Sequence, residues 1–317
     1  MIKKEIGGYF AFGDLVDKEY YNNCLRFNSA RNSLRYLIEK RGIKKIYLPY
    51  YLCDSMDDVC KKTEVIVKHY HISKEFLPII EDEILDDEYV CIVNYYGILG
   101  DDIILSLKEK YHRIVVDNTH AFFSKPIDGI DTIYSCRKFF GVPDGSYLST
   151  DLKMDDHIVK GKSFFRAKHL FGRLEYSASD FFNEYRKAEM SFDDDIAEMS
   201  DMTRCIMGAL DYGRIEKKRR ENISFMHSCL GEKNELDFKI ENMCFMYPFL
   251  CNNSESLREE LIKNRVYVPV LWPNVLESKE NIFEYRLAKD IIPIPIDQRY
   301  DLHDMKYIYD IIRRVYE

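Results

Sequence analysis

Three short apolar runs between residues 88 and 135 limit the possible folds of this chain more than any other feature. They are EYVCIV (88–93), RIVVD (113–117) and GIDTIYS (129–135). Continuous apolar runs, in place of alternating ones, are typical of parallel strands in a sheet whose two faces are both covered. The segment between the first two runs, DDIILSLKEKYH (101–112), has the apolar spacing of a helix. Strand, helix and strand in this order predict an α/β fold with a parallel sheet and right-handed crossovers.

The preceding residues repeat this alternation. FNSARNSLRYLIEKRG (27–42) begins with small polar residues, carries apolar residues at helical spacing and ends at a glycine, so it predicts a helix. KIYLP (45–49) and TEVIVKHYHI (63–72) predict two more strands. We therefore expect a large domain over residues 1–230, with a mostly parallel central sheet flanked by helices.

The rest of the chain predicts helices followed by a second, smaller domain. A long helical pattern covers 201–230, with a kink expected at Gly213. From about residue 236 the pattern changes to short mixed elements, which predict a small α+β domain over 231–317. Its expected elements are a strand within 238–251, a helix within 254–266, a strand within 267–273 and a helix over 301–317.

Composition excludes several classes of protein. Of the 317 residues, 46% are hydrophobic, which is enough for a sizeable core. The net charge is −8 and no basic stripe alternates with aromatic residues, so we expect no nucleic-acid partner. The sequence has no apolar run of about 18 residues and no signal-peptide core at its N-terminus, so we expect no membrane segment and a cytoplasmic protein. The nine cysteines form no CxxC motif, which favours free thiols over a metal site.

Polar residues follow the three predicted strands at the point where each strand ends. Asn94 follows the first, Asp117 and His120 follow the second, and Ser135 and Lys138 follow the third. Ligands of open α/β sheets bind at the carboxyl ends of the strands, so these side chains predict a site. Taken singly, each residue has a structural explanation as a turn residue, a cap, a packed histidine or a surface lysine. Their occurrence at successive strand ends favours a common function.

Ser135 and Lys138 also match the Ser-x-x-Lys motif of penicillin-binding enzymes, whose lysine activates the serine. That chemistry needs companion Ser-Asp-Asn and Lys-Thr-Gly elements, and the sequence contains neither. The short motif alone therefore does not indicate a serine nucleophile.

Pyridoxal 5′-phosphate (PLP) explains the whole group better. This cofactor needs a lysine that bonds its aldehyde, an acid beside its ring nitrogen and hydrogen-bond donors for its phosphate. Lys138 offers the amine, and Asp117 offers the acid on the neighbouring strand. A helix start offers free backbone N–H groups at the positive end of the helix dipole. The candidate phosphate donors are the helix start at Ser29, Ala30 and Arg31 and the hydroxyl of Ser135.

The order of these motifs resembles that of the DegT/StrS-type sugar aminotransferases, which are PLP enzymes of fold type I. VVDNTHAFF (115–123) is similar to the family's Asp-x-x-Gln/His-Ala motif, with Asp117 and His120 in place. YSCRKFFGVPDGSYL (134–148) is similar to its Ser…Lys…Gly-Gly segment, with a shorter interval between serine and lysine. Ala30 stands where the family's phosphate turn has a glycine. Further similar segments are IGGYF (6–10), NSARNSLRYLI (28–38), IYLPYYLCDSM (46–56), VNYYG (93–97) and IIPIPIDQRYDLHDMKYIYDIIRRV (291–315).

The resemblance implies PLP as the cofactor and a role for several residues. Lys138 would hold PLP and move the proton in transamination, and Asn94 would line the site. His120 would lie against the ring or on the side of its oxygen, and either Tyr51 or Cys53 would face the ring. The amino donor would be an amino acid such as glutamate. The acceptor would be a keto sugar linked to a nucleotide, in the synthesis of amino sugars for surface polysaccharide or lipopolysaccharide.

The resemblance also implies a homodimer, in which residues 183–200 contribute to the partner's site. Two alternatives to transamination remain open. One is another PLP reaction on the same scaffold, such as dehydration. The family's dehydratases replace the lysine with histidine, so Lys138 argues against that branch. The other is a protein of this fold that binds a sugar nucleotide or a partner without transamination.

Overall fold

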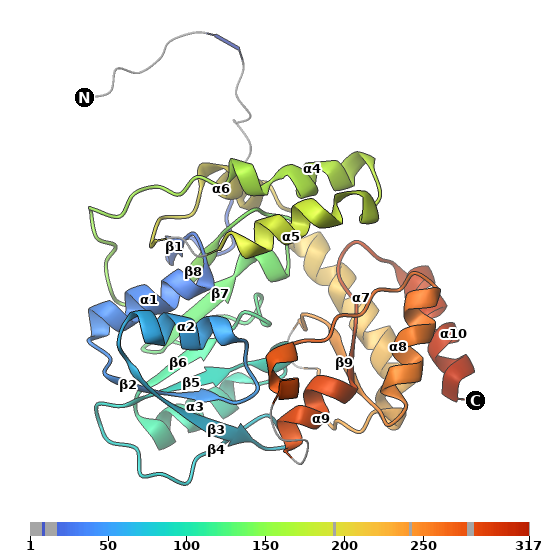
Figure 1. Ribbon diagram of the computed structural model, residues 1–317, viewed down its shortest axis with the longest axis horizontal. Coiled ribbons are helices and arrows are strands. Elements are labelled where there is room, and N and C mark those ends of the chain that lie inside the picture. The colour runs from blue at the N-terminus through green and yellow to red at the C-terminus, as the bar shows by residue number, and fades with distance from the viewer. Residues whose placement is uncertain (1–7, 10–17, 193–194, 241–242, 278–281, 317) are drawn as a thin grey trace.

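The structure is a computed structural model of the chain, and it describes residues 8–9, 18–192, 195–240, 243–277 and 282–316. Most of the segment IGGYF (6–10) lies outside these residues. Figure 1 shows a large sheet with helices in one part of the molecule, and helices around a short strand pair in the other. Among the described helices, none combines the length and the apolar character that crossing a membrane requires.

The large sheet has eight strands within the described residues. They are β1 (Leu25–Phe27), β2 (Lys45–Pro49), β3 (Ile66–Ile72), β4 (Pro78–Ile79), β5 (Tyr89–Val93), β6 (Ile114–Asp117), β7 (Asp131–Ser135) and β8 (Ser146–Ser149). Their spatial order is β1-β8-β7-β6-β5-β2-β3-β4. The five strands from β7 to β3 are parallel, and β8, β1 and β4 each pair antiparallel. The predicted α/β fold with a mostly parallel sheet is confirmed.

The first three helices separate strands as the sequence predicts, whereas β6, β7 and β8 follow one another with no α-helix in the described residues between them. In the first part the helices are α1 (Ala30–Arg41), α2 (Asp54–Lys62), α3 (Asp101–Tyr111), α4 (Lys168–Glu175), α5 (Phe182–Met190) and α6 (Asp201–Gly208). The later helices are α7 (Tyr212–Leu230), α8 (Ser254–Lys263), α9 (Phe283–Asp290) and α10 (Leu302–Tyr316).

Local sequence sets both ends of α1. The helix begins after Ser29, whose side chain accepts a hydrogen bond from the backbone N–H of Asn32 (3.3 Å). It ends at Gly42, which adopts the left-handed conformation with φ of 63° that glycine tolerates. The predicted helix over 27–42 is confirmed, and its start at Ala30 places a helix N-terminus beside the carboxyl ends of the strands.

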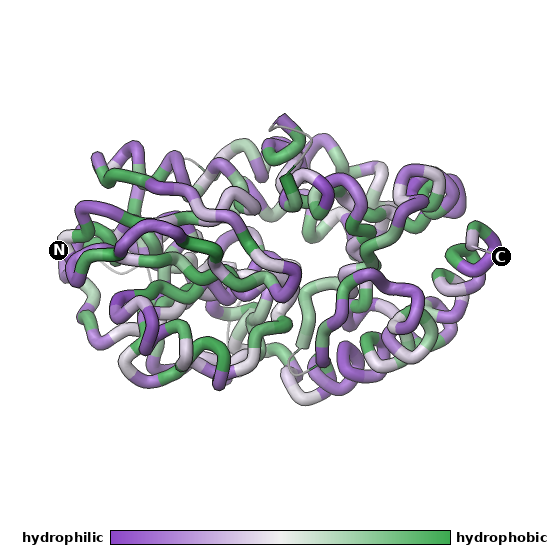
Figure 2. Tube along the Cα trace, turned by 90° about the horizontal axis from the view of Figure 1, so that it is seen from below, coloured by the Kyte–Doolittle hydropathy of each residue, from purple (hydrophilic) through white to green (hydrophobic). Residues whose placement is uncertain are grey.

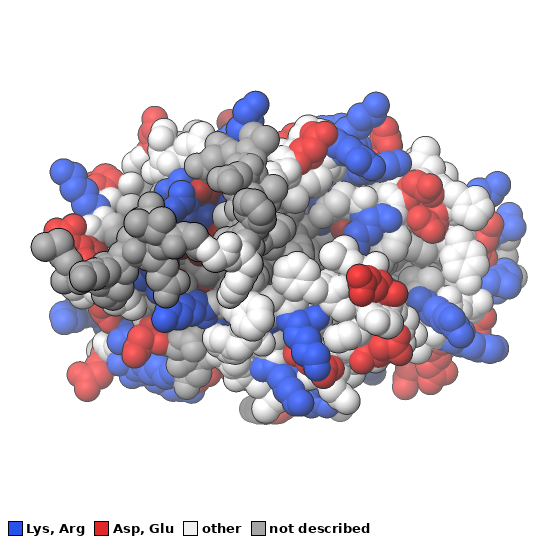
Figure 3. All heavy atoms as spheres, turned by 90° about the horizontal axis from the view of Figure 1, so that it is seen from above, with Lys and Arg blue, Asp and Glu red and all other residues white. Residues whose placement is uncertain are grey.

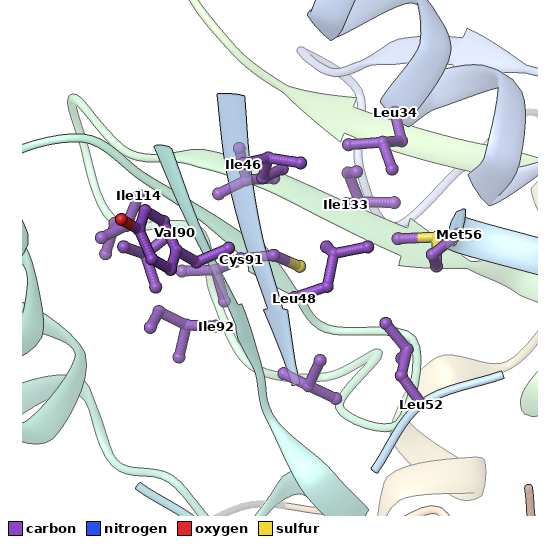
Figure 4. Packing of buried hydrophobic residues seen from close by; sticks show 14 of the residues in the cluster. Leu34, Ile46, Leu48, Leu52, Met56, Val90, Cys91, Ile92, Ile114 and Ile133 are labelled. Atoms are coloured by element: carbon purple, nitrogen blue, oxygen red, sulfur yellow. The ribbon is translucent and has the colours of Figure 1, made fainter. Parts of the chain in front are cut away.

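Two apolar clusters cover the two faces of β7. Ile133 belongs to the main core with Leu34 of α1 and Met56 of α2, and Figure 4 shows these three side chains together. Tyr134 points to the opposite face because side chains alternate along a strand. There it packs in an aromatic cluster that includes Met207 of α6. β7 is therefore buried on both sides, as its continuous apolar run predicts.

The C-terminal part has a core of its own. β9 (Tyr247–Leu250) pairs antiparallel with β10 (Ile291–Ile294), and α7, α8 and α10 pack around the pair. This core joins Ile223 of α7 with Phe249 of β9 and Ile308 of α10. In Figure 2 the apolar strands of the large sheet run between the helices on its two sides. The division predicted between residues 230 and 231 stays a prediction, and α7 packs with the elements that follow it.

The pattern over 201–230 is two helices and not one helix kinked at Gly213. The chain leaves the helical conformation between α6 and α7, and Asp211 starts α7 by accepting a hydrogen bond from the N–H of Arg214 (3.0 Å). Gly213 lies inside the first turn of α7, where the helix continues through it. The expected kink is wrong because the capping aspartate, and not the glycine, sets the break.

Two strand predictions in the C-terminal part need correction. The stretch 267–273 is not a strand: it runs as irregular chain to Trp272, which adopts a left-handed φ of 52°. The strand expected within 238–251 is shorter than the pattern suggests. In the described part of that stretch, only the four residues of β9 form a strand. Apolar runs of this kind follow from burial alone, and burial does not require a hydrogen-bonded partner strand.

Candidate active site at the strand ends

Lys138 lies on the short helical turn that follows β7. Lys138 is exposed to solvent, yet desolvation by the surrounding protein lowers the pKa of its amine below that of a free lysine. The nearby charge of Arg137 lowers the pKa further, whereas Cys53 and Asp117 act in the opposite direction. The amine therefore loses its proton more easily than an exposed lysine does.

Asp117 ends the neighbouring strand β6 and is 6% exposed. One carboxylate oxygen, Oδ1, accepts a hydrogen bond from the backbone N–H of Thr119 (2.9 Å). Burial raises the pKa of Asp117, and the Thr119 contacts and the charge of Lys138 offset part of this rise. The site thus holds an acid and an amine, and each is partly desolvated.

His120 is 5% exposed and packs against two aromatic rings of the C-terminal part. Its ring centroid lies 4.6 Å from that of Phe245, with 27° between the planes, and 5.3 Å from that of Trp272, with 30°. Burial, and secondarily the charge of Lys138, holds the pKa of His120 well below its usual range, so the ring is neutral. Its buried Nδ1 has no hydrogen-bond partner among the described residues.

The N-terminus of α1 lies on the same side of the site. Ser29 uses its hydroxyl to cap Asn32, while Ala30 and Arg31 begin the helix. The guanidinium of Arg31 donates a hydrogen bond to the carbonyl of Phe192 (2.7 Å), and its charge lowers the pKa of the Lys138 amine. The start of α1 therefore lies close enough for the Arg31 charge to act on Lys138, and the role of this helix N-terminus as a phosphate seat stays a prediction.

The other predicted residues divide between the site and the interior. Cys53 precedes α2, is partly exposed and is among the groups that shift the pKa of Lys138, so it lies at the site. Ser135 is buried at the end of β7. Tyr51 is fully buried, with its hydroxyl 3.3 Å from that of Tyr96.

Asn94 is also directed into the protein. Its amide nitrogen donates to the carbonyl of Leu99 (3.4 Å) and to the side chain of Asn118 (3.1 Å). Its Oδ1 accepts from the N–H of Leu99 (2.9 Å). Both polar ends of this side chain therefore hold the turn after β5, and its role at the cofactor stays a prediction.

Arg137, Arg166 and Phe192 form a cluster that sequence reasoning missed. The guanidinium groups of Arg137 and Arg166 lie 3.8 and 4.3 Å from the centroid of the Phe192 ring. Arg137 also pairs with Glu189, and burial together with the charges of Arg31 and Arg166 lowers its pKa to about 10. Only the basic pair at 137–138 signals this cluster in the sequence, because its other members lie far along the chain.

The turn after Lys138 is fixed by Asp144 and Gly145. The buried Asp144 carboxylate accepts hydrogen bonds from the N–H (3.1 Å) and hydroxyl (2.8 Å) of Ser200 and from the hydroxyl of Thr203. Gly145 adopts φ of 111°, and a Cβ there would lie 2.8 Å from a methyl carbon of Thr203. A glycine is therefore required where the lysine turn packs on the start of α6.

No family model and no curated protein sequence matches this chain. Solved structures do match its fold. DesV of S. venezuelae in complex with a ketimine intermediate is 14% identical, with a TM-score of 0.65 over 93% of this chain and 85% of that chain. A DegT DnrJ EryC1 StrS aminotransferase of Brucella abortus is 11% identical, with a TM-score of 0.63 over 92% and 85%. The E. coli GDP-4-keto-6-deoxy-D-mannose-3-dehydratase with bound hydrated PLP is 15% identical, with a TM-score of 0.61 over 92% and 87%.

The chain has the fold of the DegT-type sugar aminotransferases. The similarity extends over nine-tenths of the chain, so it includes both the large sheet and the C-terminal part. The predicted fold type I architecture is thereby confirmed, and the strand ends that carry Asp117 and Lys138 are the ligand-binding side of such a sheet.

Proposed function

We propose that this chain is a PLP-dependent aminotransferase that moves an amino group from an amino acid, glutamate, to a keto sugar. The observation that carries the proposal is the pair of Asp117 and Lys138 at the ends of neighbouring strands, beside the N-terminus of α1. A lone buried acid or a lone lysine has many uses. An acid, an amine with a lowered pKa and a helix N-terminus at one strand edge match the three groups that PLP needs.

The donor set fits this cofactor. Lys138 would bind the aldehyde of PLP, and Asp117 would be the acid beside its ring nitrogen. The backbone N–H groups of Ala30 and Arg31 and the hydroxyl of Ser135 are donors for the phosphate. The unpartnered Nδ1 of His120 is a further polar atom that a ligand can satisfy. PLP, when bound, supplies an electron sink that makes a C–H bond of an amino acid acidic.

The chain's own groups then control charge and protons. Because its pKa is lowered, Lys138 accepts and returns a proton at its Nζ near neutral pH more readily than an exposed lysine. With PLP bound, the Asp117 carboxylate would be the acid for its ring nitrogen, and a negative charge there would favour the protonated ring. Neutral His120 adds no positive charge that would compete with that proton.

A basic groove beside the site supports a phosphorylated acceptor, which we propose to be a nucleotide-linked sugar in amino-sugar and surface-polysaccharide synthesis. The groove lies between α1 and α2 and has a volume of about 450 Å³. Its charged lining residues are four basic ones, Arg31, Arg35, Lys61 and Lys62, and one acid, Asp58, which pairs with Lys61. Arg35→Ala is expected to weaken the reaction with the acceptor and to leave the reaction with glutamate unchanged.

The hairpin of α4 and α5 supports a homodimer. α4 buries none of its residues, although it carries several large apolar side chains. Figure 3 looks onto the face of the molecule that carries this hairpin and α6. Glu189 near the end of the hairpin pairs with Arg137, so a second copy docked here would lie next to the site. The exposed side chains are Phe164, Phe165, Phe171, Leu174, Tyr176, Phe182, Tyr185 and Met190.

The predicted partner segment 183–200 overlaps this hairpin, and its residues 193–194 lie outside the described part of the chain. Dehydration on the same scaffold is the second candidate function. The likeness to the E. coli dehydratase supports it, whereas the lysine at position 138 favours transamination.

The test is the visible absorbance of the protein mixed with PLP, before and after glutamate. Wild type and the control Lys239→Ala, an exposed lysine, are expected to show a yellow band that glutamate bleaches. Lys138→Ala is expected to lack the band. A wild type without a band, or a band indifferent to Lys138, would refute the cofactor assignment. A band that forms but resists glutamate and other amino acids would refute transamination.

A further inference from the structure

The proposed cofactor needs an aromatic or apolar face for its ring, and the structure does not place that face where the sequence suggests. Position 53 carries a thiol, and Tyr51 lies in the core. The ring of His120 is only 5% exposed because Phe245 and Trp272 pack on it. Little of its surface is left for a ligand ring.

Phe245 is the aromatic ring next to the lysine. The Nζ of Lys138 lies 5.7 Å from the centroid of the Phe245 ring. Phe245 as a residue is partly exposed, so it is not closed off from a ligand. Its ring stacks on His120 at 4.6 Å and packs against Phe139 at 5.9 Å between centroids. A cofactor that Lys138 holds by its aldehyde would place its ring close to that amine, and so within reach of Phe245.

The backbone of Phe245 is fixed from both sides. Its N–H donates to the carbonyl of Tyr96 (3.2 Å), and Tyr96 adopts a left-handed φ of 56° after β5. Its carbonyl accepts from Nη1 of Arg219 (3.3 Å), a fully buried arginine of α7. Arg219 also donates to Gln298 (2.9 Å), and Gln298 donates to the carbonyl of Phe139 beside the lysine (2.7 Å). These bonds hold the ring in place before any ligand arrives.

We propose that Phe245 supplies the aromatic face on which the pyridine ring of PLP stacks. This inference rests on the proposed function, because it concerns the same cofactor. It assigns the stacking residue to the C-terminal part of the chain, about 190 residues beyond the position that the resemblance indicates. Aromatic rings in offset contact attract each other through dispersion and their quadrupoles, so an aliphatic side chain at position 245 loses part of that attraction.

The experiment titrates the protein with PLP and follows the fluorescence of Trp272, the only tryptophan in the chain, which lies 5.3 Å from His120. Phe245→Leu is expected to bind PLP roughly tenfold more weakly than wild type, and Phe245→Tyr is expected to restore the affinity. Tyr267→Leu, which removes an exposed ring, is the matched control and is expected to bind as wild type does. The visible band of bound PLP is expected to move in Phe245→Leu and to return in Phe245→Tyr.

Urea unfolding of each variant separates a lost contact from a lost fold. If Phe245→Leu does not fold, Phe245→Met replaces it with the same expectation. Equal affinity and an unmoved band in a folded Leu or Met variant would overturn the assignment of Phe245 while leaving PLP binding by the wild type intact. A wild type that does not bind PLP would overturn the proposed function itself, and this inference with it.

Discussion

Replacing Asp117 by asparagine is expected to stabilise the free protein and to impair its reaction. The carboxylate is buried and burial raises its pKa, so the folded chain bears a cost for keeping this group ionised at neutral pH. Asparagine has the same shape and keeps the oxygen that accepts the N–H of Thr119 at 2.9 Å. Removing a buried charge that has too few hydrogen-bond partners raises the free energy of unfolding by about 1–3 kcal/mol. We expect Asp117→Asn to gain about this much stability.

The pH dependence of this gain has a definite sign. An acid whose pKa is raised by folding binds protons more tightly in the folded state, so its cost appears as pH rises above the unfolded pKa of about 3.9. The cost is complete once pH exceeds the raised pKa in the folded state. The stability difference between Asp117→Asn and wild type is therefore largest near pH 7 and disappears toward pH 3–4.

Urea unfolding of the PLP-free protein at several pH values measures this difference. Asp128→Asn, at an exposed aspartate, is the control and is expected to change stability by less than about 0.5 kcal/mol. The reaction with PLP and glutamate changes in the opposite sense to stability. Asp117→Asn is expected to react at least about 100-fold more slowly than wild type, because the ring nitrogen loses its anionic partner. An Asp117→Asn protein that is no more stable than wild type at pH 7, or whose gain does not vary with pH, would refute the reasoning.

Three further predictions follow from the geometry. Gly145→Ala is expected to lose about 2–4 kcal/mol in urea unfolding, because its φ is 111° and a Cβ would lie 2.8 Å from a neighbouring methyl carbon. Gly141→Ala, whose Cβ would meet its nearest atom at 3.9 Å, is the control and is expected to change stability by less than about 1 kcal/mol. Arg137→Gln removes a charge that lowers the pKa of Lys138, so the pH profile of the PLP absorbance band is expected to move to higher pH, and an unmoved profile would contradict this electrostatic account. Leu174→Glu, at a side chain 80% exposed on the hairpin, is expected to shift the protein toward monomer in sedimentation, and an unchanged dimer would show that the interface lies elsewhere.

The parts of the candidate site that could be predicted from the sequence are those for which a few consecutive residues give the signal. Asp117 and Lys138 could be predicted because each directly follows an apolar run, and parallel strands bring their carboxyl ends to one edge. Both ends of α1 could be predicted because Ser29 before the helix and Gly42 after it are local cap signals. In each case a few consecutive residues contain the information.

The parts that escaped prediction depend on contacts between distant segments. Phe192 reaches Arg31 from 161 residues away, and Phe245 reaches the lysine without any motif around it. Asn94 has the expected position, but its polar atoms bond within its own turn and to Asn118, and residue type alone does not show which partner a side chain has. The short antiparallel strand β8 also lacks a pattern of its own, because four residues are too few to show periodicity.

The hydrogen bonds that run from Arg219 through Gln298 to Phe139 have a consequence for the order of events in the cell. A ribosome releases the strand ends that carry Asp117 and Lys138 long before it adds residue 298, and N-terminal segments fold first during synthesis. The lysine turn can pack on the start of α6 earlier, but it lacks the bond from Gln298 to Phe139 until residue 298 has emerged. A nascent chain that ends before Gln298 is expected to have the sheet but not the finished site, so the protein becomes competent to bind its ligand only after residue 298 has been added.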